Sequence, residues 1–189
     1  MTRNSPTIIL LGLPGSGKTT CGQELATSLS LPFQSIGNIL RSGRLERTLE
    51  NSVDPAAEYL SLDISRNIHL YSKGLILDFS PVTAEGGRML KKTLEGKGFD
   101  IVFTVYIKVG LGIARQRYKL RGFRHGDPTT DMELLFNQRI TEEFWPYTVP
   151  MVRNAFRTGG LLVVNNTNRE SRLNDLKNVA GEINAILQK

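Results

Sequence analysis

Short apolar runs alternate along the chain with longer segments in which apolar residues recur at helical spacing. Continuous apolar character, typical of strands buried on both faces, marks residues 7–12, 75–78, 101–107 and 161–164. Helix-like patterns mark residues 20–29, 56–70, 139–156 and 173–187. Strands that alternate with helices predict βαβ units, so we expect an α/β fold with a mostly parallel sheet and helices on both faces.

Two polar segments interrupt this alternation. Residues 37–54 carry several arginines, and residues 121–130 combine Gly122, Gly126 and Pro128 with charged side chains. We expect both segments to be insertions at one edge of the sheet, where binding groups tend to lie. Because the chain has 189 residues and no linker-like run, it is predicted to form one domain.

The composition excludes several classes of protein. Hydrophobic residues make up 40% of the chain and charged residues 22%, which argues against disordered, collagen-like and coiled-coil proteins. No apolar run reaches the roughly 18 residues of a membrane span, and no secretion signal is recognisable, so we expect a cytoplasmic protein. Cys21 is the single cysteine and there are two histidines, which argues against a disulfide, a structural zinc site or a multi-histidine metal centre.

The charge balance favours anionic ligands. The chain carries 24 Lys and Arg against 18 Asp and Glu, a net charge of +6, and arginine is the commoner basic residue. Planar guanidinium groups suit phosphates held in a defined geometry. The basic residues are not interleaved with aromatic ones, and no nucleic-acid-binding signature stands out. These observations argue against nucleic acid as the partner, but the charge alone does not distinguish a lipid surface from a small phosphate compound.

Residues 12–19, with the sequence GLPGSGKT, match the phosphate-loop pattern G-x-x-x-x-G-K-[ST] at every fixed position. The glycines let backbone N–H groups point inward at a helix N-terminus, which makes a cradle for an anion. Lys18 would add a positive charge at the β and γ phosphates, and the Thr19 hydroxyl can ligate Mg²⁺. The alternative is a Gly/Pro turn with an accidental lysine, but the motif follows an apolar strand and precedes a helical segment. The predicted ATP-binding residues here are Gly12, Pro14, Gly15, Ser16, Gly17, Lys18, Thr19 and Thr20.

A carboxylate that follows a second buried strand completes a magnesium–triphosphate site. Asp78 ends the apolar run 75–78, where it could orient metal-bound water together with Thr19. The alternative is that Asp78 caps the following helix. Asp54 and Asp63 are weaker candidates, because no buried strand precedes them.

Arginines gather after the strand predicted at 101–107. Arg115, Arg117, Arg121 and Arg124 lie in a segment that can be a helix running into a loop, and Arg139 follows beyond that loop. Arg117 and Arg121 share a helix face, where like charges repel mildly, so an anionic ligand explains their placement better than helix stability does. Phosphoryl transfer needs such cations around its transition state. The alternative for any single arginine is a solvated surface residue.

Several of these motifs together resemble the adenylate kinase family of nucleoside monophosphate kinases, over nearly the whole chain. Residues 12–20 (GLPGSGKTT) match its phosphate loop, 35–41 (SIGNILR) are similar to its S-T-G-D-x-L-R, and 74–81 (GLILDFSP) are similar to its strand ending in D-G-F-P-R. Thr148 and Pro150 match its T-x-P, and residues 164–167 (VNNT) resemble the adenine-side loop after its last strand.

The resemblance implies a P-loop NTPase fold: a three-layer α/β/α sandwich with a parallel sheet. It implies one kinase domain over residues 1–189, with an NMP-binding insertion at about 36–70 and a short, zinc-free lid at about 121–135. It also implies ATP and Mg²⁺ as cofactors, with Asp78 at the magnesium-water position. The partners it implies are small-molecule nucleotide substrates, with no nucleic acid or membrane, for a protein that acts as a monomer. The catalytic group would comprise Lys18, Arg121, Arg124 and Arg139. Arg117 and Asn166 would lie on the adenine side, and the acceptor phosphate would be held through Ser35, Gly37 and Arg41.

The acceptor half departs from the family pattern. Ile36 and Asn38 replace a threonine and an aspartate, Val82 stands where the family has an acceptor-clamping arginine, and Gly86 stands where it has a glutamine that reads AMP. Arg88 is one residue that could substitute for the missing clamp, as are Arg44 and Arg47. Three functions therefore stay open: an ATP-dependent nucleoside monophosphate kinase, a kinase of a non-AMP nucleotide or other small metabolite, and a nucleotide-binding protein that has lost turnover.

Overall fold

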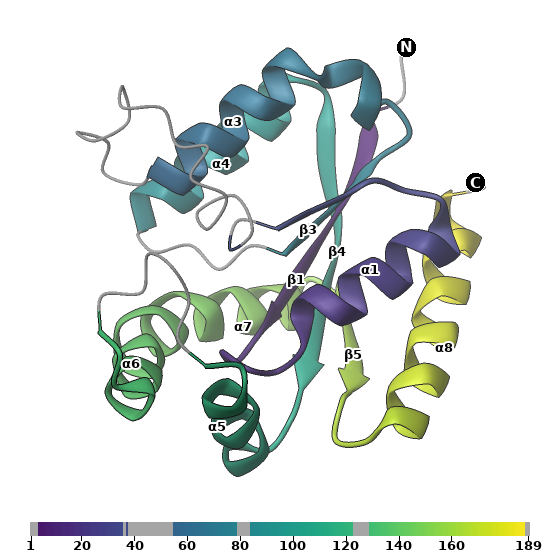
Figure 1. The fold of residues 1–189 in the computed structure, drawn as a ribbon. Coiled ribbons are helices and arrows are strands. Elements are labelled where there is room, and N and C mark those ends of the chain that lie inside the picture. The colour runs from purple at the N-terminus through teal and green to yellow at the C-terminus, as the bar shows by residue number, and fades with distance from the viewer. Residues whose placement is uncertain (1–3, 36, 38–54, 79–83, 123–128, 188–189) are drawn as a thin grey trace.

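A computed structural model describes residues 4–35, 37, 55–78, 84–122 and 129–187 of the chain. Its centre is a five-stranded sheet in the order β2-β3-β1-β4-β5, in which every neighbouring pair is parallel (Figure 1). The strands are β1 (Ser5–Gly12), β2 (Phe33–Ser35), β3 (Leu75–Asp78), β4 (Phe99–Lys108) and β5 (Leu161–Asn165). All five strands therefore end at the same edge of the sheet.

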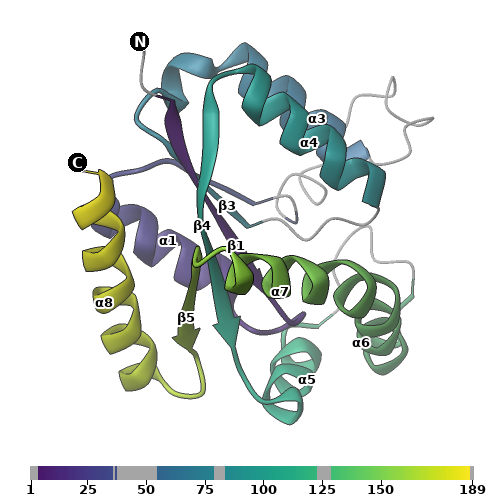
Figure 2. The same ribbon diagram turned by 180° about the vertical axis from the view of Figure 1, so that it is seen from behind.

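Helices cover both faces of the sheet. On one face lie α1 (Lys18–Leu29) and α8 (Arg169–Leu187). In Figure 1, α1 passes in front of the strands and α8 lies to their right. The other face carries α3 (Pro55–Arg66), α4 (Ala84–Gly96) and α7 (Val149–Arg157), of which α4 and α7 are nearest the viewer in Figure 2. The predicted three-layer α/β/α fold with a parallel sheet is confirmed.

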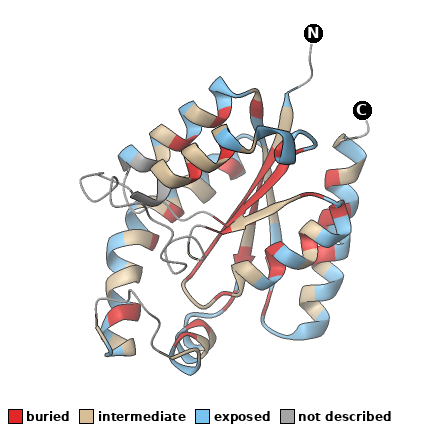
Figure 3. Ribbon diagram, turned by 45° about the horizontal axis from the view of Figure 1, so that its top comes forward, coloured by how far each residue is buried: buried red, intermediate tan, exposed pale blue. Residues whose placement is uncertain are grey.

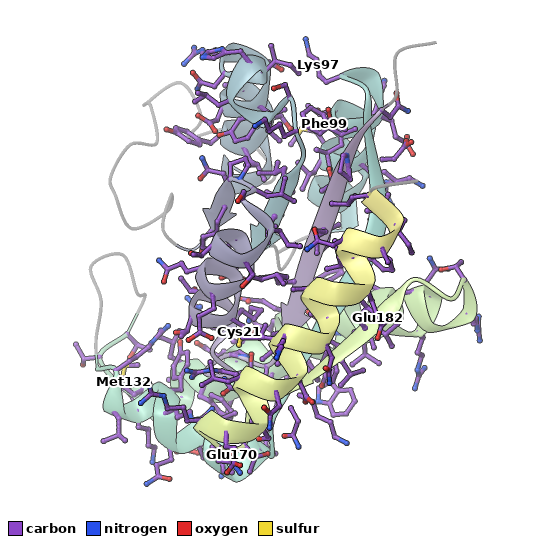
Figure 4. The ribbon with its side chains drawn as sticks, turned by 90° about the vertical axis from the view of Figure 1, so that its right-hand side faces the viewer. Cys21, Lys97, Phe99, Met132, Glu170 and Glu182 are labelled. Atoms are coloured by element: carbon purple, nitrogen blue, oxygen red, sulfur yellow. The ribbon has the colours of Figure 1, made fainter. Side chains whose placement is uncertain are left out.

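Burial follows this layering, with the strands forming the interior (Figure 3). Ile8 and Leu10 of β1 are fully buried and pack in one cluster with Cys21 of α1 and Val179 of α8. Figure 4 shows the two helices side by side, with Cys21 on α1. The second face has its own cluster, in which Leu75 and Leu77 of β3 pack against residues of α3 and α4. Because β1 is buried on both faces, its sequence is a continuous apolar run rather than an alternating one.

A third group of helices lies at the edge where the strands end. It consists of α5 (Leu111–Leu120), α6 (Met132–Arg139) and the π-helical segment η3 (Ile140–Thr148), which continues directly into α7. Leu13 of the loop after β1 shares a buried cluster with Tyr118 of α5, Phe136 of α6 and Phe144 of η3. These helices are therefore packed against the phosphate-loop segment itself.

The edge strand β2 is tied to α3 by hydrogen bonds between side chains. The Tyr71 hydroxyl donates to Asp63 Oδ2 at 2.5 Å, and Gln34 Nε2 donates to the Tyr71 hydroxyl at 2.8 Å. Asn67 Nδ2 donates to the other Asp63 oxygen at 2.9 Å. Burial and the Asp63 bond raise the pKa of Tyr71 to about 12. The network holds β2 in place, and Asp63 serves this structural role.

Most predicted elements are confirmed, and the differences are local. All four predicted strands are present, and the predicted helices at 20–29 and 173–187 correspond to α1 and α8. The helix predicted at 56–70 ends at Arg66, and the 3₁₀ turn η2 (Ile68–Tyr71) follows it. The segment predicted as one helix at 139–156 is the end of α6, then η3 and α7. Among the described residues, no helix has the length and apolar character needed to cross a membrane.

Candidate functional site

The loop between β1 and α1 lies where the strand order reverses. β1 lies between β3 and β4. The chain continues from β1 to β2 on one side of it and later from β3 to β4 on the other, so the loop after Gly12 lies where these connections diverge. Ligands of open parallel sheets bind at such a position, beyond the carboxyl ends of the strands. The α1 helix starts here at Lys18, with Gly17 as its N-cap, no side-chain cap and no acidic residue in its first turn. Its N-terminal N–H groups are therefore available to an anion.

Two glycines of this loop have no room for a side chain. Gly15 has φ +79°, and a Cβ there would lie 2.3 Å from the backbone oxygen of Ala114 in α5. Gly17 has φ +87°, and a Cβ there would lie 2.4 Å from Asn166 Nδ2. Both conformations are ones that other residues rarely adopt. The glycine spacing of the motif therefore reflects tight contacts with α5 on one side and with the segment after β5 on the other.

Lys18 points back across the loop. Its Nζ donates to the carbonyl oxygens of Gly12 at 3.0 Å and Leu13 at 3.2 Å. Burial lowers the pKa of Lys18, whereas the nearby carboxylates of Asp78 and Glu143 raise it. Arg139 and Arg121 lower it further, so three cations converge on this loop. Such a cluster favours a multiply charged anion.

Ser16 adds an unsatisfied group to the same loop. Its Oγ is buried and has no hydrogen-bond partner among the residues that the structure describes. Buried polar groups are almost always hydrogen-bonded, so an orphaned hydroxyl beside an open helix N-terminus fits a ligand that accepts hydrogen bonds. The loop therefore fits a phosphate-bearing ligand in charge and hydrogen-bonding capacity.

Three oxygens meet at the ends of α1, β2 and β3. Thr19 Oγ1 donates to Asp78 Oδ2 at 2.8 Å, and Ser35 Oγ donates to the same oxygen at 3.2 Å. Asp78 is buried, and β2 and β3 pair in a register that puts Ser35 opposite it. Hard oxygen donors of this kind suit Mg²⁺, which takes one or two protein oxygens and the phosphates of its ligand. The alternative role of Asp78 as a helix cap stays open, because residues 79–83 lie outside the described residues.

A chain of hydrogen bonds links α5, the segment after β5 and the phosphate loop. Arg117 of α5 donates from Nη1 to the Asn166 carbonyl at 2.8 Å and from Nη2 to the Thr167 carbonyl at 3.2 Å. Asn166 in turn donates from Nδ2 to the Ser16 carbonyl at 2.7 Å. Asn166 is 3% exposed and its N–H donates to Lys108 at the end of β4. Arg117 and Asn166, which the sequence predicts on one side of the site, therefore brace the phosphate loop.

Arg121 and Arg139 approach the site from α5 and α6 around one aromatic ring. The Arg121 Cζ lies 3.8 Å from the ring centroid of Tyr118, and the Arg139 Cζ lies 5.9 Å from it. Cations over the face of an aromatic ring are attracted by its quadrupole. Tyr118 is fully buried, so it gives both guanidinium groups a fixed support.

Other predicted residues lie elsewhere or outside the described part. Thr20 is exposed in the first turn of α1, Pro14 is half-buried in the loop, and Gly37 is half-buried just beyond β2. Arg88 is exposed on α4. The predicted residues Arg41 and Arg124, the alternative clamps Arg44 and Arg47, and the departures Ile36, Asn38 and Val82 lie outside the described residues.

Sequence reasoning missed two features of the site. Tyr118 supports two predicted arginines, but a tyrosine on a helix gives no local signal of this role. Glu143 lies near Lys18 and forms an ion pair with Arg139, with 3.9 Å between Nε and Oε1. The spacing of four residues between Arg139 and Glu143 is the signal that could have indicated this pair. Arg115, in contrast, pairs with Glu133 of α6 at 3.4 Å, which joins α5 to α6.

Comparison with known proteins places this geometry in a family. Residues 11–134 match a family model described as AAA domain. The chain is 31% identical over 137 residues to "Adenylate kinase" of Mycobacterium leprae (strain Br4923), covering 66% of this chain and 74% of that protein. It is 31% identical over 140 residues to "Adenylate kinase" of Mycobacterium tuberculosis (strain ATCC 25618 / H37Rv), covering 67% and 75%. It is 27% identical over 199 residues to "Adenylate kinase" of Sinorhizobium medicae (strain WSM419), covering 95% and 98%.

Proposed function

The chain belongs to the adenylate kinase-like family, and on that premise we propose that it is an ATP-dependent phosphotransferase that moves the γ-phosphoryl group of ATP·Mg to a nucleoside monophosphate. Family membership supports a nucleotide kinase of the P-loop type. The observation that carries the finer proposal is the convergence of Lys18, Arg121 and Arg139 on an open helix N-terminus, beside the Thr19–Asp78 pair.

The roles proposed for these residues follow from charge. Lys18, Arg121 and Arg139 would neutralise the charge that spreads over the transferring phosphoryl group. Lys18 hydrogen-bonds two main-chain carbonyls, so its charge is already positioned at the loop. Arg124 is proposed for the same group and Arg41 for the acceptor phosphate, from the resemblance of their motifs.

Thr19 and Asp78 would hold Mg²⁺, with Ser35 hydrogen-bonded to the same Asp78 oxygen. Bound there, the ion would neutralise phosphate charge and orient the phosphate chain. The side of the site formed by Arg117 and Asn166 would face the adenine. Because Asn166 also bonds the Ser16 carbonyl, ordering on the adenine side and ordering of the phosphate loop would be coupled.

A second proposal concerns the acceptor. Val82 and Gly86 replace the arginine and glutamine with which the family clamps and reads AMP, which favours a non-AMP nucleotide or another small metabolite as acceptor. Arg88 is exposed on α4, two residues after Gly86, and could reach an acceptor phosphate. If no acceptor is phosphorylated, the remaining proposal is a nucleotide-binding protein that has lost turnover. We propose a monomer acting in the cytoplasm in each case.

The test is release of ADP from ATP and Mg²⁺ in the presence of each common nucleoside monophosphate in turn. We expect at least one monophosphate to raise ADP release well above the rate with ATP alone. A Lys18→Met variant should lower the turnover number on the order of a thousandfold. ATP binding without release that depends on a nucleoside monophosphate would leave a non-nucleotide acceptor or lost turnover, and absence of ATP binding would contradict all three proposals.

A further inference from the structure

Glu143 is a carboxylate in a place that should repel phosphate. It lies in η3, its side chain is 25% exposed, and its Oε1 is 3.9 Å from Arg139 Nε. Its charge also raises the pKa of Lys18, so it is electrostatically coupled to two of the cations proposed to bind phosphate. Asp78, the other carboxylate that raises the Lys18 pKa, is assigned to the metal, whereas the proposed function gives Glu143 no task.

The surrounding structure holds Glu143 in this position. Its neighbour Phe144 is buried in the same cluster as Leu13 of the phosphate loop, so η3 is anchored on the loop. Glu142 precedes it and is exposed. Burial raises the pKa of Glu143, while Arg139 and Lys18 lower it and Glu142 raises it. The carboxylate is thus withdrawn from water, which is unfavourable for a charge unless nearby cations compensate.

The cluster of cations is also unfavourable by itself. Lys18, Arg121 and Arg139 each carry a positive charge close to one another, and the two arginines lower the pKa of Lys18. Like charges in a partly desolvated site repel unless an anion lies among them. When nucleotide is bound, the phosphate chain supplies that anion. Without nucleotide, Glu143 is a carboxylate that the structure places beside Arg139.

We propose that Glu143 is an internal counter-anion, which pairs with Arg139 in the nucleotide-free protein and is exchanged for substrate phosphate on binding. This inference rests on the proposed binding of a triphosphate at the loop. Glu143 acts through the cations that it holds and is a positioning residue. Glu143 lowers the affinity of the loop for free triphosphate, because it competes with phosphate for the same cations. It also stabilises the cation cluster when no nucleotide is bound.

The first experiment measures the affinity of the full-length protein for inorganic tripolyphosphate and for ATP by calorimetry. Glu143→Gln removes the competing charge and should bind tripolyphosphate on the order of tenfold more tightly than the wild type. Glu142→Gln changes the net charge equally at an exposed neighbouring position and should bind like the wild type. Glu143→Asp keeps the charge and should lie closer to the wild type than to Glu143→Gln.

The second experiment measures the melting temperature without nucleotide as sodium sulfate is added at constant ionic strength. Glu143→Gln should melt at a lower temperature than Glu142→Gln in the absence of sulfate, and sulfate should restore more of its stability, because an external anion replaces the lost carboxylate. A defect in packing alone would gain from sulfate only the general stabilisation that Glu142→Gln also gains.

The outcomes separate this inference from the proposed function. Tripolyphosphate affinity in Glu143→Gln that is equal to or weaker than that of the wild type overturns the counter-anion role, even if the wild type binds ATP. A wild type that binds tripolyphosphate but not ATP contradicts the proposed function and leaves the Glu143 comparison measurable. A wild type that binds neither contradicts both.

Discussion

The hydrogen bonds of Lys18 explain how a charged side chain is kept ready without a ligand. Its amine donates to the Gly12 and Leu13 carbonyls at 3.0 and 3.2 Å, on the opposite side of the phosphate loop. A phosphate oxygen is a stronger partner for an ammonium than a neutral carbonyl, because its negative charge adds a Coulomb attraction to the hydrogen bond. The amine is therefore positioned by bonds that a phosphate can replace at a net gain.

Cys21 provides a test of burial at the scale of one residue. It is fully buried between α1 and α8, and burial raises the pKa of its thiol from 9.0 to about 11. The thiolate is the reactive form, so the folded protein should not react with iodoacetamide at pH 8, whereas the urea-unfolded protein should react fully. Mass spectrometry of the labelled protein measures both. Rapid labelling of the folded protein would contradict the packing of α1 on α8.

The same shift gives a pH dependence with a definite sign. Because the folded pKa lies above the unfolded one, Cys21 favours folding fully below pH 9, and this contribution is lost as the pH rises through about 11. The free energy of unfolding of the wild type should therefore fall more steeply between pH 9 and 10.5 than that of Cys21→Ala. Urea unfolding at the two pH values, with the variant as control, measures the difference in slope.

At the scale of elements, the contact between α5 and the phosphate loop is the tightest in the site. An alanine Cβ at Gly15 would lie 2.3 Å from the Ala114 carbonyl of α5 and would require φ +79°. Gly15→Ala should therefore lower the free energy of unfolding by about 2 to 4 kcal/mol and weaken ATP binding, because either the loop or α5 must move. Urea unfolding and calorimetric titration with ATP measure the two effects.

Gly112, in α5 itself, is the matched control. A Cβ there meets nothing within 4 Å, and alanine favours helix more than glycine does. Gly112→Ala should raise the free energy of unfolding by roughly 0.5 to 1 kcal/mol and leave ATP binding unchanged. If Gly15→Ala behaves like Gly112→Ala, the close contact between α5 and the loop is wrong.

The elements predicted well from the sequence are those whose signal is local. The phosphate loop is a contiguous motif after a fully apolar strand, so β1 and the start of α1 could be predicted from residues 7–29 alone. The edge strand β2 could not, because its three residues form a strand only by pairing with β3. Ser35 could therefore be assigned to the acceptor by resemblance, but its bond to Asp78 depends on that pairing.

The segment after Arg139 could not be predicted in detail for a different reason. Its pattern indicates a helix, but the nine residues of η3 are π-helical and include Pro146, which has no N–H for a helical hydrogen bond. A π-helix rotates its residues relative to the positions that an α-helix would give them. The position of Glu143 therefore depends on how η3 packs, through Phe144, against Leu13 of the phosphate loop. No pairwise pattern in the sequence encodes this contact.

At the scale of the whole molecule, the sheet order decides where the charges meet. Ser35, Asp78 and Gly12 are far apart in sequence, and the order β2-β3-β1 places their strand ends side by side. Arg121 and Arg139 come from the other side of β1, through α5 after β4 and through α6, whereas Lys18 and Thr19 begin α1 directly after the loop. Ser35 and Asp78, proposed at the metal, and the two arginines, proposed at the phosphates, thus lie on opposite sides of β1, which suits a metal-bound triphosphate.

Because the proposed ligand bridges these two halves, it should stabilise the fold as a whole. At an ATP concentration one hundred times its dissociation constant, binding contributes about 2.7 kcal/mol, which for a domain of this size raises the melting temperature by about 5 to 10 °C. The net charge of +6 means that ATP could also bind unspecifically elsewhere, so Lys18→Met is the necessary control. Differential scanning fluorimetry at increasing ATP should show a large shift in the wild type and little in the variant. Equal shifts in both would mean that ATP binds to the basic surface rather than to the loop between β1 and α1.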